Sequence, residues 1–146
     1  MRKVQSGKWG IDRGMNCGKL REMKSILVVE DDRLLGREIV EELTQNGFAP
    51  VLARDGAEAL ASLTTGNFGL IFLDIMLPGD LDGFEILKRL KADEKLENIP
   101  VIILSNLGQT QEIDRAMDLG ARDYVVKATV DLDRLAEIAK KHLSPA

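Results

Sequence analysis

The sequence predicts an α/β fold in which a five-stranded parallel sheet is covered by helices on both faces. Short apolar runs alternate with longer segments of helical periodicity five times along the chain, and strands that alternate with helices form parallel sheets. The runs are continuously apolar, which is typical of strands buried on both faces. Because crossovers between parallel strands are right-handed, few topologies remain.

The expected strands are short apolar runs that stop abruptly at a polar residue. They cover residues 26–29, 50–53, 70–73, 101–104 and 124–126. Residues that can cap a helix precede three of the helical segments. Asp32 is expected to act as a helix cap rather than as a ligand, and the pairs Asp55/Glu58 and Asp82/Glu85 predict capping boxes. The expected helices cover 33–46, the segments after Asp55 and Asp82, 110–119 and 131–142.

Length and composition predict one soluble domain. The chain has 146 residues, and its 45% of apolar residues is enough to form one buried core. No apolar run approaches the roughly 18 residues of a membrane span, and the N-terminus lacks the apolar stretch of a secretory signal. The single cysteine, Cys17, excludes an internal disulfide and indicates a reducing compartment, so we expect the cytoplasm.

Residues 1–24 differ in charge from the rest of the chain. They hold seven Lys and Arg against two acids, a net charge of +5, whereas the remainder carries −9. A basic tail on an acidic body can bind nucleic acid or a membrane surface. Because this segment is Gly-rich and lacks periodicity, we expect a disordered leader or linker. The domain itself is expected over 25–143, with a tail at 144–146.

Polar residues with complementary chemistry follow four of the expected strands. Glu30 and Asp31 follow the first, Asp74 the third, Ser105 the fourth and Lys127 the fifth. In an open parallel sheet, ligands bind at the carboxyl ends of the strands. Clustered carboxylates favour a hard cation such as Mg²⁺, and an aspartate can act as a nucleophile that forms an aspartyl phosphate. A lysine and a hydroxyl can then stabilise phosphoryl oxygens.

These residues resemble the bacterial response-regulator receiver domains of two-component signalling. The acidic cluster Glu30-Asp31-Asp32, the segment 73–79 around Asp74, Ser105, and the segment Tyr124-Val125-Val126-Lys127 occur in the family's order. The resemblance spans about 25–143 and implies a flavodoxin-like (βα)5 fold with strand order 2-1-3-4-5.

The resemblance implies a role for each residue. Asp74 would accept a phosphoryl group from a histidine kinase or a phosphotransfer protein, with Lys127 contacting the phosphoryl group. Asp31, Asp74 and the Met76 carbonyl would bind Mg²⁺ directly, and Glu30 would act through a metal-bound water. Ser105 would move toward the phosphoryl group and Tyr124 would change rotamer with it.

The same resemblance implies partners and a mode of output. The surface formed by 110–119, 124–126 and 131–142 would report phosphorylation to a downstream protein or an output domain. The domain itself would be a monomer or weak homodimer that binds neither nucleic acid nor membrane, and it would catalyse only its own phosphotransfer and dephosphorylation. The sequence leaves open whether it acts alone or within a longer regulator or hybrid kinase.

Three features depart from the family's usual pattern. Ala128 stands after Lys127, where the family commonly has a proline in a cis peptide. The loop 78–83 is one residue longer than usual, and Asn106 follows Ser105 where a small residue is more frequent. We expect these three features to affect the rates of phosphorylation and hydrolysis.

Two other functions compete with a phosphorylation switch as interpretations of the sequence. A receiver-like interaction module that signals without phosphate would not need the intact acidic and lysine residues. A phosphatase with an aspartate nucleophile would need a second acid two residues after Asp74, where Met76 stands, and no P-loop motif is present. The sequence 64–67 resembles a flavin phosphate loop but precedes the third strand, so we expect a plain turn.

Overall fold

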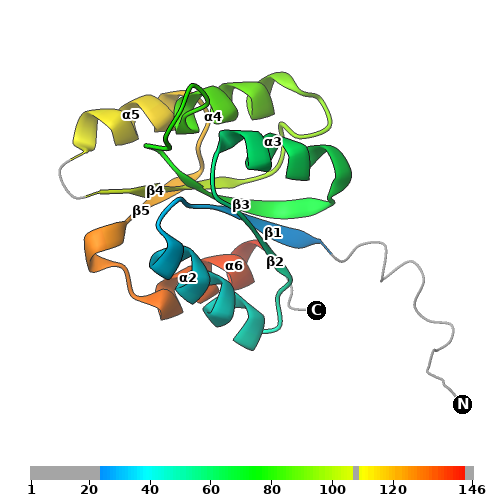
Figure 1. Ribbon diagram of the computed structural model, residues 1–146, viewed down its shortest axis with the longest axis vertical. Helices are drawn as coiled ribbons and strands as arrows, with labels where there is room; N and C mark the ends of the chain where they lie inside the picture. The colour runs from blue at the N-terminus through cyan, green and yellow to red at the C-terminus, as the bar shows by residue number, and fades with distance from the viewer. Residues whose placement is uncertain (1–23, 107–108, 144–146) are drawn as a thin grey trace, which may run out of the picture.

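A computed structural model describes residues 24–106 and 109–143, which form three layers (Figure 1). A sheet lies in the middle. Helices α2 (Arg33–Gln45) and α6 (Leu132–His142) cover one face, and α3 (Gly56–Thr65), α4 (Gly83–Ala92) and α5 (Thr110–Asp118) cover the other. Within these described ranges, no helix is long and apolar enough to cross a membrane. The expected leader, apart from Lys24, and the expected tail at 144–146 lie outside the described residues.

The sheet has five strands, and all neighbouring strands are parallel. They are β1 (Ser25–Val29), β2 (Pro50–Ala53), β3 (Phe68–Asp74), β4 (Val101–Ser105) and β5 (Asp123–Val126). Their order is β2-β1-β3-β4-β5. This confirms the predicted five-stranded sheet, its order 2-1-3-4-5 and the flavodoxin-like (βα)5 arrangement.

Burial on both faces explains the continuous apolar runs. All seven residues of β3 are buried. Ile71 and Leu73 belong to the core beneath α3 and α4, whereas Leu70 and Phe72 belong to the core beneath α2 and α6. Each fully buried side chain of this size stabilises the fold by roughly 1.5–3 kcal/mol. The central strand therefore anchors both cores and fixes the position of Asp74 at its end.

The helix caps form as predicted, but the reciprocal bonds of the two capping boxes do not. The carboxylates of Asp32, Asp55 and Asp82 accept hydrogen bonds from Leu35, Glu58 and Glu85 N–H at 3.0, 2.8 and 3.0 Å. Glu58 accepts from Arg54 N–H at 2.9 Å instead of from its own cap residue. Glu85 pairs with Arg89 Nε at 3.1 Å, one helical turn ahead.

Several predicted boundaries move by one or two residues. The helices predicted over 33–46 and 110–119 end at Gln45 and Asp118, because Asn46 and Leu119 are cap residues. The helix predicted from 131 begins at Leu132, since Asp131 is its N-cap. Strand β3 begins at Phe68 instead of residue 70 and includes Asp74.

The longer loop after β3 packs against the start of α3. Gly79 turns it with φ +87°. Leu81 lies so close to Gly56 that a Cβ there would be 2.4 Å from the Leu81 Cβ. The segment containing Ala128 forms a short 3-10 helix, η1 (Lys127–Thr129), and the described residues contain no cis peptide bond.

Gly83 gives a test of how tightly α4 packs beside the end of β3. A Cβ at Gly83 would lie 2.5 Å from the Asp74 carbonyl oxygen and 2.7 Å from Ile75 Cα. Helix propensity alone would make Gly83→Ala stabilising by at most about 1 kcal/mol. Overpacking against backbone costs roughly 1–3 kcal/mol. We therefore expect Gly83→Ala to lower the free energy of unfolding measured by urea titration.

Gly36→Ala in α2 is the matched control. A Cβ at Gly36 would meet only side-chain atoms, the nearest being a Leu52 methyl group at 3.2 Å. We expect this variant to be close to the wild type in stability. A Gly83→Ala protein as stable as the wild type would contradict the close approach of α4 to Asp74.

Candidate functional site

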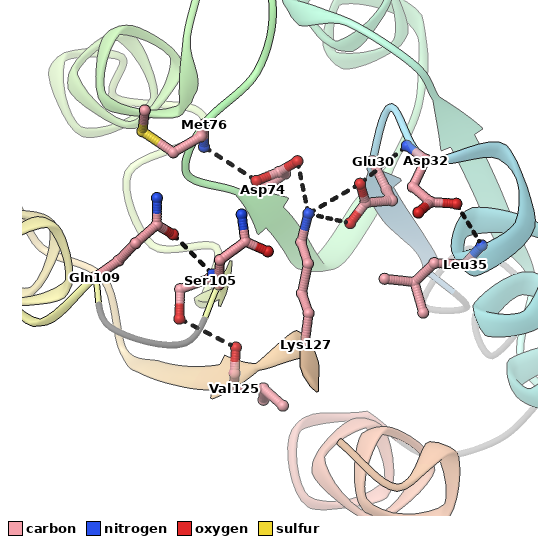
Figure 2. Close-up of polar contacts among 10 residues, drawn as sticks. Glu30, Asp32, Leu35, Asp74, Met76, Ser105, Gln109, Val125 and Lys127 are labelled. Carbon is pink, nitrogen blue, oxygen red and sulfur yellow. Dashed lines mark hydrogen bonds and ion pairs between the residues drawn. The ribbon is translucent and has the colours of Figure 1, made fainter. Parts of the chain in front are cut away.

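Three charged side chains from different strand ends meet at the carboxyl edge of the sheet (Figure 2). Lys127 Nζ lies 2.9 Å from Asp74 Oδ2 and 2.9 Å from Glu30 Oε1, and it donates a hydrogen bond to Glu30 Oε2 at 3.1 Å. Glu30 follows β1, Asp74 ends β3, and Lys127 follows β5. The strand order therefore assembles residues separated by up to 97 positions in the sequence.

The carboxylates form a group of the kind that holds a metal ion. One oxygen each from Glu30, Asp31 and Asp74 lie within 4.8 Å of one another. Glu30 and Asp74 are 1% and 2% exposed, whereas Asp31 is exposed. The group thus has two buried members and one that faces the surface. The donor set, all carboxylate oxygens, fits a hard cation such as Mg²⁺.

Burial makes the two inner carboxylates difficult to ionise. Burial is the main cause that raises the pKa of Glu30 from 4.5 to about 7, and the negative charge of Asp74 adds to it. Hydrogen bonds from Asp32 N–H and Lys127 act in the opposite direction but do not cancel it. Burial also raises the pKa of Asp74, although Lys127 and the Met76 N–H oppose the rise.

Lys127 remains charged between these groups. Burial alone would lower its pKa, but the hydrogen bonds to Asp74 and Glu30 outweigh burial and raise it. The raised pKa of Lys127 means that the site favours the charged form of this lysine. The raised pKa of Glu30 means that the same site favours the neutral form of this acid. The difference follows from solvent access, because the Glu30 side chain is fully buried whereas that of Lys127 is 15% exposed. We conclude that the ammonium is stabilised more than the carboxylate.

Backbone N–H groups fix the orientation of both buried acids. Asp74 Oδ1 accepts from Met76 N–H at 3.0 Å, and Glu30 Oε2 accepts from Asp32 N–H at 3.1 Å. Glu30 Oε1 has no hydrogen-bond partner among the described residues and contacts Lys127 only as an ion pair. Met76 is 51% exposed and contacts the site through its backbone N–H.

The two residues proposed for switching lie further from the charged cluster. Ser105 is fully buried at the end of β4, and its Oγ donates to the Val125 carbonyl at 3.5 Å, the limit of a hydrogen bond. Tyr124 lies on β5, one of the two edge strands of the sheet, and is 44% exposed. The structure thus brings Glu30, Asp31, Asp74 and Lys127 together. Neither Ser105 nor Tyr124 forms a side-chain hydrogen bond to these four residues.

Sequence reasoning missed one residue at this edge. Gln109 Oε1 accepts from the Asn106 backbone N–H at 2.7 Å, directly after Ser105 (Figure 2). Nothing in the sequence marks this contact, because its partner is a backbone group and a glutamine before a helix usually faces solvent.

Residues 64–67 lie at the opposite end of the sheet from the charged cluster, as expected. Thr64 and Thr65 are the last two residues of α3, and residues 66–67 connect this helix to β3. Gly66 caps α3 by donating to the Ser62 carbonyl at 2.9 Å, and the Asn67 carbonyl accepts from Ser25 N–H at 2.8 Å. A cavity of about 820 Å³ lies there, and none of the charged site residues lines it. The segment expected to be a plain turn is therefore the end of α3 and a two-residue connection.

Comparison with known proteins agrees with this geometry. The family model of the response regulator receiver domain matches residues 26–140. The transcriptional regulatory protein CusR of Escherichia coli K12 is 35% identical over 113 residues, which cover 77% of this chain and 48% of that protein. The chain spans about half the length of the curated relatives it matches.

Solved receiver domains have the same fold. The receiver domain of the Francisella response regulator 1452 is 34% identical, with a TM-score of 0.72 over 81% of this chain and 94% of that one. The phosphorylated cyanobacterial phytochrome response regulator RcpA is also 34% identical, with a TM-score of 0.73 over 84% and 96% of the two chains. From the fold, the strand-end acidic cluster and these matches, we conclude that the chain belongs to the response regulator receiver domain family.

Proposed function

We propose that the protein is a phospho-accepting signalling switch in which Asp74 takes a phosphoryl group. The observation that carries the proposal is the position of Lys127, whose Nζ lies 2.9 Å from Asp74 Oδ2 at a buried strand end. A carboxylate held beside a cation in a poorly solvated site can attack phosphorus while the cation stabilises the phosphoryl oxygens. Phosphoryl transfer needs such positioning more than it needs a general base.

The proposed reaction forms one bond and breaks one. An Asp74 carboxylate oxygen forms a bond to phosphorus as the bond between phosphorus and the donor nitrogen of a phosphohistidine breaks. The electron pair of that bond stays on the imidazole nitrogen, which is protonated by solvent. Hydrolysis later returns the carboxylate and releases inorganic phosphate. The domain would catalyse only these two steps on itself.

We propose Mg²⁺ as the metal of this site. Asp31 and Asp74 would bind it directly together with the Met76 carbonyl, and Glu30 would act through a metal-bound water. The cluster of three carboxylates within 4.8 Å and the raised pKa of Glu30 support this, because a bound cation relieves repulsion between crowded acids. Bound Mg²⁺ would neutralise charge on the transferring phosphoryl group.

The proposed switch acts through Ser105 and Tyr124. A phosphoryl group adds nearly two negative charges and three acceptor oxygens. The bond from Ser105 Oγ to Val125 is long at 3.5 Å, so exchanging it for a phosphoryl oxygen would cost little. Tyr124, half exposed on β5, would then turn inward and change the surface formed by α5, β5 and α6.

The proposed partners follow from this role. A histidine kinase or a phosphotransfer protein would supply the phosphoryl group, and a downstream protein or an output domain would bind the α5–β5–α6 surface. The single cysteine supports the cytoplasm as the compartment.

Asp74→Asn tests the central assignment. Acetyl phosphate with Mg²⁺ should add one phosphoryl group to the wild type and none to Asp74→Asn, measured by intact-protein mass spectrometry. Asp80→Asn is the matched control, because Asp80 is an exposed carboxylate of the neighbouring loop. We expect Asp80→Asn to be modified like the wild type. Modification that persists in Asp74→Asn would refute the assignment, and an unmodified wild type would favour a phosphate-independent interaction module.

Two adjacent aspartates test the proposed metal site. Asp31 belongs to the carboxylate cluster, whereas the Asp32 carboxylate caps α2. Asn is as good a helix cap as Asp, so Asp32→Asn removes the same charge without removing the cap. We expect Asp31→Asn to weaken Mg²⁺ binding by roughly tenfold or more, and Asp32→Asn to weaken it much less, measured by calorimetric titration. Equal losses in the two variants would indicate a diffuse charge effect instead of a ligand.

The raised pKa of Glu30 predicts how stability depends on pH in metal-free protein. The folded pKa of about 7 lies above the ordinary value of 4.5, so the folded state binds this proton more tightly than the unfolded state. The resulting stability is fully present below the unfolded pKa and is lost as pH rises through about 7.

In EDTA, the stability of the wild type relative to Glu30→Gln should therefore fall by on the order of 2 kcal/mol between about pH 5 and about pH 8. Urea unfolding at each pH measures it, and Glu30→Gln serves as the reference because it cannot ionise at this position. A difference between the two proteins that does not change with pH would contradict the raised pKa.

A further inference from the structure

Gln109 is the N-cap residue of α5 but does not cap it. Each of the helices α2, α3, α4 and α6 begins at an aspartate whose carboxylate accepts a hydrogen bond from the first turn. The side chain of Gln109 makes no such bond. Its Oε1 reaches back to the Asn106 backbone N–H at 2.7 Å, and the Gln109 N–H lies 3.4 Å from the Asn106 carbonyl oxygen.

The register of the sheet places Asn106 at the same level as Met76, after the strand that neighbours the strand of the proposed phosphoacceptor. Asp74 pairs with Leu104 in the ladder between β3 and β4, and Ile75 N–H donates to the Leu104 carbonyl at 3.0 Å. Asn106 therefore follows Leu104 by the same two positions that separate Met76 from Asp74. The Met76 N–H donates to Asp74 Oδ1 at 3.0 Å. The equivalent N–H on the neighbouring strand end donates to Gln109 instead.

A phosphoryl group on Asp74 would bring three acceptor oxygens to this edge. Donors already beside it are Lys127 Nζ and the Met76 N–H, and the Ser105 hydroxyl lies one strand away. The Asn106 N–H directly follows Ser105 and is the next backbone donor along that strand end. It can serve a phosphoryl oxygen only when Gln109 releases it, because one N–H makes one strong hydrogen bond.

We propose that Gln109 is a positioning residue that competes with the phosphoryl group for the Asn106 backbone N–H. Gln109 thereby favours the unphosphorylated form and slows uptake of the phosphoryl group. This inference rests on the proposed function of Asp74. It concerns a residue that is not among the proposed metal ligands and whose side chain bonds to Asn106 and not to Glu30, Asp74 or Lys127.

Gln109→Met tests the competition, because Met has similar length and helix propensity but lacks the amide acceptor. The probes are acetyl phosphate for the rate of phosphorylation and beryllofluoride, a mimic of the phosphoryl group, for affinity, both with Mg²⁺. Removing one net hydrogen bond from the unphosphorylated form should raise the rate of phosphorylation and the affinity for beryllofluoride, each by roughly two- to tenfold. Gln111→Met is the matched control, since Gln111 is an exposed glutamine of the same helix. We expect it to match the wild type.

Asn106→Ala separates the backbone group from the side chain at that position. The substitution keeps the N–H, so Gln109→Met should have the same effect in the Asn106→Ala background as in the wild type. If Gln109→Met has no effect in the Asn106→Ala background, the proposal is overturned, because Gln109 would then act through the Asn106 side chain and not through its backbone N–H.

A measurement on the wild type keeps the test independent of whether the variants fold. In amide NMR spectra, beryllofluoride should shift the Asn106 N–H and the Gln109 side-chain amide together as the bond between them breaks. An unchanged Asn106–Gln109 pair at saturation would overturn the proposal. If Asp74 is phosphorylated and Gln109→Met behaves like the wild type, only the proposed role of Gln109 is refuted. If the wild type takes up no phosphoryl group, both proposals are refuted.

Discussion

The contact of one ammonium group with two buried carboxylates is the constraint on which the site depends. Glu30 and Asp74 are nearly inaccessible to solvent, and this burial disfavours the ionised form of both carboxyl groups unless a positive charge lies beside them. A protonated aspartate is a poor nucleophile and a poor metal ligand. Lys127, 2.9 Å from each carboxylate, lowers this penalty without removing it, as the raised pKa of both acids indicates.

The strand order determines which residues can take part. Strands β1 and β3 are neighbours, so Glu30 and Asp74 meet directly at their ends. Strand β4 separates β5 from β3, and Lys127 therefore has to reach across the end of β4 to Asp74. A long flexible side chain with a compact charge suits that distance. Ser105 ends β4, the strand that lies between β3 and β5.

Much of this arrangement could be predicted from the sequence, because the decisive signals are local. Apolar runs that stop at Asp74 and Ser105 identify buried strands and their polar ends together, and Asp32, Asp55 and Asp82 identify helix starts. The prediction of reciprocal bonds in the two capping boxes is wrong because both glutamates have other partners. Glu58 accepts from the Arg54 N–H, and Glu85 pairs with Arg89 one turn ahead. The bond from Gln109 to the Asn106 N–H could not be predicted, since a backbone donor leaves no mark in the sequence.

The most direct test of the account is a crystal structure of the protein with Mg²⁺ and beryllofluoride. The account predicts the beryllofluoride on an Asp74 carboxylate oxygen, Lys127 Nζ in contact with it, and Mg²⁺ bound by Asp31, Asp74 and the Met76 carbonyl. Beryllofluoride bound at another residue, or a Lys127 that stays with Glu30 alone, would contradict it.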